Sequence, residues 1–126
     1  MKIPTIEAFD HLAIEVSNLD AAVDFYERTL GLTQLEAPAV ASERGIRWFS
    51  LPEGRMLHLV LNPQAAPARV GHLALRVQDV AEWKRYFQKV GVVEEAPTVE
   101  LYGNVERIFV RDPSGNRIEF LKWVRE

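Results

Sequence analysis

Apolar and polar residues alternate along several short stretches of this chain, which is the pattern of half-buried β-strands. We predict strands at the following ranges: about 9–16, 33–36, 45–51 and 56–61 in the first half, and 70–77, 92–95, 107–110 and 117–123 in the second. Two stretches, 19–30 and 80–90, repeat apolar residues every three or four positions and predict amphipathic helices. Residues 38–44 and 97–104 are predicted to be loops. Each half therefore has the order β-α-β-β-β.

Residues typical of helix ends and tight turns stand at the predicted boundaries of these elements. Ser17-Asn18 and Asp79 stand where helix N-caps are expected, and Gly31 and Gly91 stand where the two helices should end. The Pro-x-Gly sequences at 52–54 and 113–115 have the composition of tight turns before strands.

The two halves are related by a constant offset, which indicates an internal duplication. His72 follows His11 by 61 positions, and Glu119 follows His58 by the same 61 positions. We therefore expect an α+β fold of two tandem modules in one domain spanning residues 1–126. Module one covers about 6–62, a linker covers 63–68, and module two covers about 69–124. Neither module can bury its helix and its sheet face alone, so the copies must share a core or pair with another chain.

Composition narrows the possible functions. The chain has 48% hydrophobic and 26% charged residues, as ordinary globular proteins do, and its net charge of −3 without a basic run argues against a nucleic-acid partner. The absence of cysteine excludes disulfides, thiolate catalysis and cysteine-based metal sites. No apolar run approaches the length of a membrane span. We expect a cytoplasmic protein with no membrane partner.

The candidate chemistry lies on the mixed faces of the strands. His11 shares a face with Glu15, opposite apolar residues that must pack on a helix, and His72 is placed in the same way. Glu119 lies opposite Ile118 and its apolar neighbours. A lone histidine on a strand is usually a structural residue, and Glu119 alone could be a solvated acid that faces an arginine, Arg117 or Arg76.

Four segments together resemble the vicinal oxygen chelate superfamily, which includes glyoxalase I, extradiol dioxygenases, methylmalonyl-CoA epimerase, and fosfomycin- and bleomycin-resistance proteins. The segments are Phe9-Asp10-His11-Leu12, Ala22-Val23-Asp24-Phe25-Tyr26, Gly71-His72-Leu73-Ala74 and Asp112-Pro113-Ser114-Gly115-Asn116-Arg117-Ile118-Glu119-Phe120. The resemblance implies cupped mixed sheets with the helices outside. It also implies a divalent metal bound by His11, His72 and Glu119, with His58 in the fourth ligand position.

A ligand set of imidazoles and one carboxylate suits Zn, Ni, Co, Mn or Fe(II), and the sequence does not choose among them. The resemblance implies a small substrate that chelates the ion through vicinal oxygens. Family enzymes of the glyoxalase type use a carboxylate base, and Glu119 is the only matched one. Glu119 would have to leave the metal in part, or neutral His58 would act as base instead of ligand. Glu15 is a more distant candidate.

Further residues could contact the substrate. Trp48 and Phe109 correspond across the duplication and would line an apolar pocket or pack in the core. Arg107 and Arg111, with Arg117, could bind a phosphonate or carboxylate. Tyr102 lies in a loop where relatives contact substrate.

These residues lead to three hypotheses. The first is a metal-dependent glyoxalase-like enzyme of the lyase, isomerase or transferase type. The second is an Fe(II) ring-cleaving dioxygenase, although the chain is short for one. The third is a metal-free protein that sequesters a drug or other ligand. The resemblance also implies a homodimer, in which one subunit supplies His11 and His58 and the other supplies His72 and Glu119.

Overall fold

The computed structural model describes residues 1–95 and 103–124. It divides the chain into two compact units, Met1–Ala65 and Ala66–Glu126. Each unit contains one mixed β-sheet with helices, so the predicted α+β class is confirmed.

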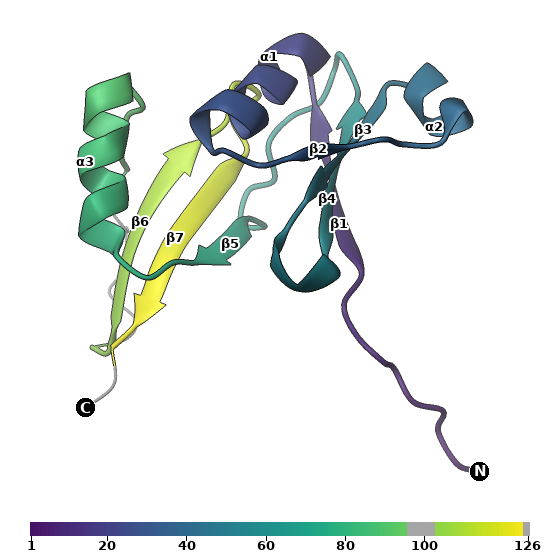
Figure 1. Cartoon of the computed structure of the whole chain (residues 1–126), viewed down its shortest axis with the longest axis horizontal. Helices are drawn as coiled ribbons and strands as arrows, with labels where there is room; N and C mark the ends of the chain where they lie inside the picture. Colours follow the sequence, from purple (N-terminus) through teal and green to yellow (C-terminus); the bar gives the residue numbers. More distant parts are fainter. Residues whose placement is uncertain (96–102, 125–126) are drawn as a thin grey trace. The chain divides into compact units, whose positions relative to one another are not determined.

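The sheet of the first unit has the strand order β1-β4-β3-β2 (Figure 1). Its strands are β1 (His11–Val16), β2 (Gln34–Leu35), β3 (Ile46–Ser50) and β4 (Met56–Leu61). β1 runs parallel to β4, and the other neighbours are antiparallel. The predicted bounds of β4 are confirmed, and the other three strands lie within the predicted ranges.

The first helix begins as predicted but changes its winding. In α1 (Leu19–Asp24), the Asn18 side chain accepts a hydrogen bond from the Ala21 backbone amide at 3.0 Å. The chain then continues as a π-helical turn, η1 (Phe25–Thr29), instead of the single helix predicted for 19–30. The fully buried side chains of this unit pack between helix and sheet; they are Val16, Ala22, Tyr26, Phe49, Leu57 and Leu59.

The loop predicted at 38–44 is wrong, because these residues contain a short helix, α2 (Ala39–Glu43). Pro38 is the N-cap, and its carbonyl accepts bonds from the Ala41 and Ser42 amides at 2.9 and 3.0 Å. The helix has no buried residue, so it lacks the apolar stripe by which longer helices are recognised. The predicted Pro-x-Gly turn is a single 3₁₀ turn, η2 (Pro52–Gly54).

The sheet of the second unit has the order β5-β7-β6, with the helix α3 beside it in Figure 1. Its elements are β5 (Leu73–Arg76), α3 (Val80–Val90), β6 (Val105–Arg111) and β7 (Arg117–Trp123). Asp79 caps α3 by accepting a bond from the Glu82 amide at 3.0 Å, and Gly91 ends it with a φ of 82°. The fully buried side chains here include Phe87, Val110 and Ile118.

Two strand predictions for this unit need correction. The strand predicted at 70–77 is shorter, because residues 69–70 form a bend and pairing begins at Leu73. The strand predicted at 92–95 is reduced to one bridge, in which Glu95 and Phe109 exchange backbone bonds of 2.7 and 3.2 Å. Most of the predicted loop 97–104 lies outside the described residues. Within the described part of the chain, no helix is long and apolar enough to span a membrane.

Candidate functional site

His11 and His58 lie on one face of the sheet in the first unit. In the parallel pairing of β1 and β4, His58 is opposite Ala13, and His11 precedes Ala13 by two positions. Because side chains alternate between faces, both histidines point away from the packed face that contains Leu57. Their rings stack, with centroids 4.1 Å apart and planes 17° apart.

Trp48 covers the other side of the His58 ring. It is directly opposite His58 in the antiparallel pairing of β3 and β4, and the two rings are nearly parallel, with centroids 4.5 Å apart. The imidazole therefore lies between an indole and a second imidazole. His58 is 8% exposed, and among the described residues its Nε2 has no hydrogen-bond partner. Burial lowers the pKa of His58, the nearby His11 lowers it further, and Asp10 raises it in part. The ring is therefore held in its neutral form.

Asp10 orients His11. Its Oδ2 lies 2.7 Å from the His11 Nδ1. A carboxylate at this distance favours the tautomer with the hydrogen on Nδ1, so that Nε2 keeps its lone pair for a ligand. Glu15, on the same sheet face, accepts a bond from the Asn62 side-chain amide at 2.9 Å.

His72 and Glu119 form a second pair, in the other unit. His72 directly precedes β5 and Glu119 lies in β7, with 2.8 Å between Nε2 and Oε1. The His72 Nδ1 is 3.0 Å from the Val70 carbonyl oxygen, which can only accept a hydrogen bond. Nδ1 therefore carries a hydrogen. The contact between Nε2 and Glu119 then requires a second proton, because a lone pair and a carboxylate oxygen would otherwise face each other.

Glu119 could have been a solvated acid at the surface, but its side chain is buried and the residue is only 6% exposed. Its Oε2 is 3.7 Å from Nη1 of Arg107, whose side chain is also largely buried. Phe109 pairs with Glu119 across β6 and β7, and its ring makes a T-shaped contact with the His72 ring, with centroids 5.7 Å apart. The guanidinium of Arg117 lies 3.7 Å from the centre of the Phe109 ring. The second pair is therefore set among arginines and an aromatic ring.

Other predicted substrate residues have different surroundings. Arg111 donates from Nε to Glu95 and from Nη1 to the Gly115 carbonyl, each at 2.8 Å, so it braces the turn before β7. Tyr102 lies outside the described residues. No role was predicted for Asp112, yet it is 4% exposed and accepts hydrogen bonds from two backbone amides of this turn. An acid at the first position of a Pro-x-Gly turn was the available signal.

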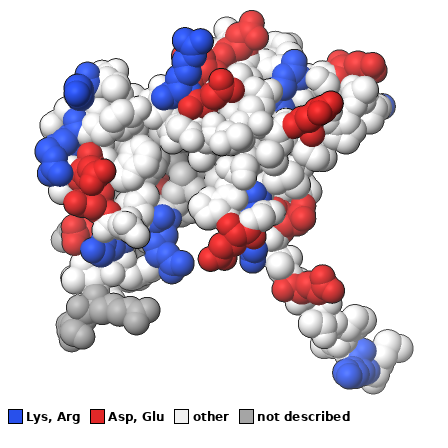
Figure 2. Space-filling view, in the orientation of Figure 1, with Lys and Arg blue, Asp and Glu red and all other residues white. Residues whose placement is uncertain are grey.

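The structure thus shows the four predicted metal ligands as two pairs, one in each unit. Among residues 1–95 and 103–124, no group of three or more His, Asp or Glu side chains that could hold a metal ion is found. Each pair has the donor chemistry of a borderline divalent ion, and the Nε2 of His58 is a buried nitrogen without a hydrogen-bond partner that an ion would satisfy. Figure 2 shows both charge signs interspersed on the face in view.

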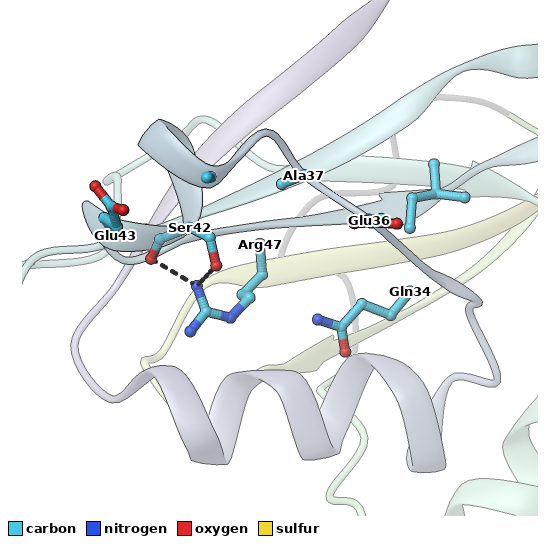
Figure 3. Close-up of a pocket in the computed structure, with 8 residues that line it drawn as sticks. Gln34, Glu36, Ala37, Ser42, Glu43 and Arg47 are labelled. Atoms are coloured by element: carbon cyan, nitrogen blue, oxygen red, sulfur yellow. Dashed lines mark hydrogen bonds between the residues drawn. The ribbon is translucent and has the colours of Figure 1, made fainter.

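A cavity of about 450 Å³ in the first unit was not anticipated from the sequence. Figure 3 shows the residues that line it, among them Gln34, Glu36, Ala37, Ser42, Glu43 and Arg47. The available signal was Arg47, because it occupies a position on the apolar side of the predicted strand 45–51.

The known proteins to which this chain is similar include lactoylglutathione lyases and glyoxalase family proteins. Two curated lactoylglutathione lyases, from serogroup A and serogroup B strains of Neisseria meningitidis, are each 29% identical over 122 residues, which cover 89% of this chain and 88% of the relative. A solved glyoxalase family protein from Bacillus anthracis is 27% identical with a TM-score of 0.85, covering 97% of this chain and 99% of its own.

Two more distant structures share the fold. The lactoylglutathione lyase of Agrobacterium tumefaciens is 24% identical with a TM-score of 0.73, covering 94% of this chain and 96% of its own. The fosfomycin resistance protein FosX of Listeria monocytogenes is 16% identical with a TM-score of 0.76, covering 92% of this chain and 91% of its own. The model of one family matches residues 8–120. The chain therefore belongs to the Glyoxalase/Bleomycin resistance protein/Dioxygenase superfamily.

Proposed function

We propose that the protein is a divalent-metal-dependent enzyme of the glyoxalase type, which acts on a small substrate that presents two neighbouring oxygens. Family membership and the lactoylglutathione lyase relatives support this class of reaction. The observation that carries the proposal is the contact of His72 Nε2 with Glu119 Oε1 at 2.8 Å, which brings two metal-ligand atoms together in a partly buried position.

The residues that would hold the ion are His11, His72 and Glu119, with His58 as the fourth. Asp10 and the Val70 carbonyl each engage an Nδ1, which leaves the Nε2 atoms of His11 and His72 as the ligating atoms. When bound, the ion would act as a Lewis acid toward the substrate oxygens. Zn, Ni, Co, Mn and Fe(II) remain the candidates.

Isomerase or lyase chemistry also needs a group that accepts a proton. In the described structure Glu119 already contacts His72 and Arg107, whereas His58 is neutral and its Nε2 is unpaired. These surroundings favour His58 as the base over Glu119. In that role His58 would not be a ligand, and the ion would keep three protein ligands and open positions for the substrate.

Metal binding tests the proposal first. Protein purified without a His tag should contain a transition metal or bind one in calorimetric titrations with Zn²⁺, Ni²⁺, Co²⁺, Mn²⁺ and anaerobic Fe²⁺. The loaded protein should then convert the adduct of methylglyoxal and glutathione, or open fosfomycin. Oxygen uptake with catechols and Fe²⁺ would instead identify a dioxygenase. Metal content below about a tenth of an equivalent, with no binding of any added ion, would reject the metal-dependent enzyme and favour a protein that sequesters a ligand.

We further propose a homodimer whose subunits share each site. A light-scattering mass of one chain would reject this arrangement. A stronger test mixes two inactive double variants, H11A/H58A and H72A/E119Q. In a shared site, the heterodimer contains one centre with all four ligands, so metal binding and activity return on mixing. If each site lies within one chain, mixing restores neither.

A further inference from the structure

The cavity of the first unit lies behind the strand that supports Trp48. Directly opposite residues in an antiparallel pair share a face, so Trp48 shares a face with His58. Arg47, one position earlier, is opposite the fully buried Leu59. The Arg47 side chain therefore projects from the face of the sheet opposite to that of Trp48 and His58. Gln34, opposite Phe49, is on that same face. The cavity that Arg47 and Gln34 line is thus separated from the histidine pair by the sheet itself.

The Arg47 guanidinium is held in place by one of its nitrogens. Nη1 donates to the Ser42 carbonyl at 3.1 Å, to the Ser42 hydroxyl at 3.4 Å and to the Ile46 carbonyl at 3.0 Å. In the described structure Nε and Nη2 make no hydrogen bond. This free edge has two parallel N–H groups, which is the arrangement that binds a carboxylate through both of its oxygens.

Carboxylates are present around the cavity, but they do not neutralise Arg47. Glu36 and Glu43 both line it, yet neither forms an ion pair with Arg47 in the described residues, and Figure 3 shows the Glu43 carboxylate directed away from the guanidinium. The Gln34 side chain extends to the same side of the sheet as Arg47 (Figure 3). The cavity therefore presents one positive charge, a primary amide and two separate negative charges.

These groups define the class of ligand. A simple anion could bind Arg47 but would be repelled by both glutamates. A simple cation would be attracted by the glutamates but repelled by Arg47. A molecule with a carboxylate and a separate ammonium group matches both signs of charge, the carboxylate at Arg47 and the ammonium at a glutamate. The volume of about 450 Å³ falls within the range of about 300–1,000 Å³ that is usual for small-molecule sites. We propose that this cavity binds a small zwitterion, an amino acid or short peptide, through Arg47 and the flanking glutamates.

A titration followed by ¹H–¹⁵N NMR tests the proposal on metal-free, full-length protein. Glycylglycine is the probe, and acetate and methylammonium carry each of its charges alone. We expect saturable shifts at the amides of Gln34, Ala37 and Arg47, with an affinity for glycylglycine at least about tenfold above that for either single ion. The R47M substitution should weaken binding by at least about tenfold. The matched control is R44M, because Arg44 is a neighbouring exposed arginine that does not line the cavity.

A second variant, E36Q/E43Q, tests the other charge without touching the guanidinium. Both glutamates are exposed, so folding should be unaffected, and glycylglycine should then bind no better than acetate. The proposal is overturned if glycylglycine causes no saturable shift at these amides. It is equally overturned if acetate binds as tightly, or if E36Q/E43Q keeps the affinity of the unmodified protein. Because the samples contain no metal, none of these results depends on whether the protein has the proposed metal-dependent activity.

Discussion

The imidazole of His58 lies face to face with the indole of Trp48, with their planes 2° apart and their centroids 4.5 Å apart. The two residues are opposite each other in neighbouring strands, so the backbone itself sets this contact. Trp48 is therefore one cause of the burial that lowers the pKa of His58. The same contact fixes the plane of the ring, and with it the direction of its unpaired Nε2.

Replacement of Trp48 should raise the pKa of His58. In metal-free W48A the ring gains contact with water, which favours its charged form, so the pKa should move up towards the ordinary value. W48F keeps an aromatic face over the ring and should show a smaller change. The measurement is a pH titration of the histidine ring protons by NMR, which is tractable because the chain has only three histidines. An unchanged His58 titration in W48A would show that other groups bury this ring.

The lowered pKa of His58 also predicts how stability depends on pH. Above the unfolded-state value of 6.5, both the folded and unfolded states are neutral at this residue, and it has no effect. As the pH falls through 6.5, the unfolded chain binds the proton first, so the free energy of unfolding decreases until the folded state is protonated too. Urea unfolding of the metal-free protein between pH 8 and 5, compared with H58Q, should show this loss only in the unmodified protein. An equal loss in both would assign the dependence to other groups.

The His72–Glu119 pair predicts that metal binding releases a proton. An ion bound at Nε2 of His72 must displace the proton that now lies between the two residues. Calorimetric titrations in buffers with different ionisation enthalpies should report about one proton from this pair per ion. E119Q should reduce metal affinity by at least about 100-fold and remove that proton release.

E15Q is the matched control for the metal titration. It neutralises a carboxylate on the same sheet face as His11, but Glu15 already accepts a bond from Asn62 and is not a proposed ligand. Its metal affinity should stay within a few-fold of the unmodified protein. A loss in E15Q as large as that in E119Q would mean that general negative charge, and not ligation, attracts the ion.

The sequence predicted best those features that depend on local periodicity. Strict alternation placed His11 on the face opposite the buried Val16, and the capping acid Asp79 set the start of α3; both follow from a few neighbouring residues. The family resemblance was also confirmed, because turn and strand motifs survive as short segments. The metal centre itself stays a prediction.

Features that depend on packing between distant segments were not predictable. The stacking of Trp48 on His58 needs the register of the β3–β4 hairpin, which is set by the 3₁₀ turn at Pro52–Gly54. The short helix α2 has no buried side chain, so no periodic pattern marked it, and the cavity at Arg47 was missed with it. The change to a π-helical turn at Phe25 likewise leaves the 3.6-residue pattern almost intact.

Asp112 should be a stability determinant of the second unit. Its Oδ1 accepts bonds from the backbone amides of Ser114 and Asn116 at 2.9 and 2.8 Å, and its Oδ2 accepts one from the Asn116 side chain at 3.0 Å. D112A would leave these partly buried donors without an acceptor and should lower the free energy of unfolding by about 1–3 kcal/mol. Urea unfolding measures the change, with E106Q as control, because Glu106 is an exposed acid on β6. The turn that Asp112 closes directly precedes the strand of Glu119, so D112A should also weaken metal binding. If stability falls while metal affinity is unchanged, the turn supports folding but does not position the proposed ligand.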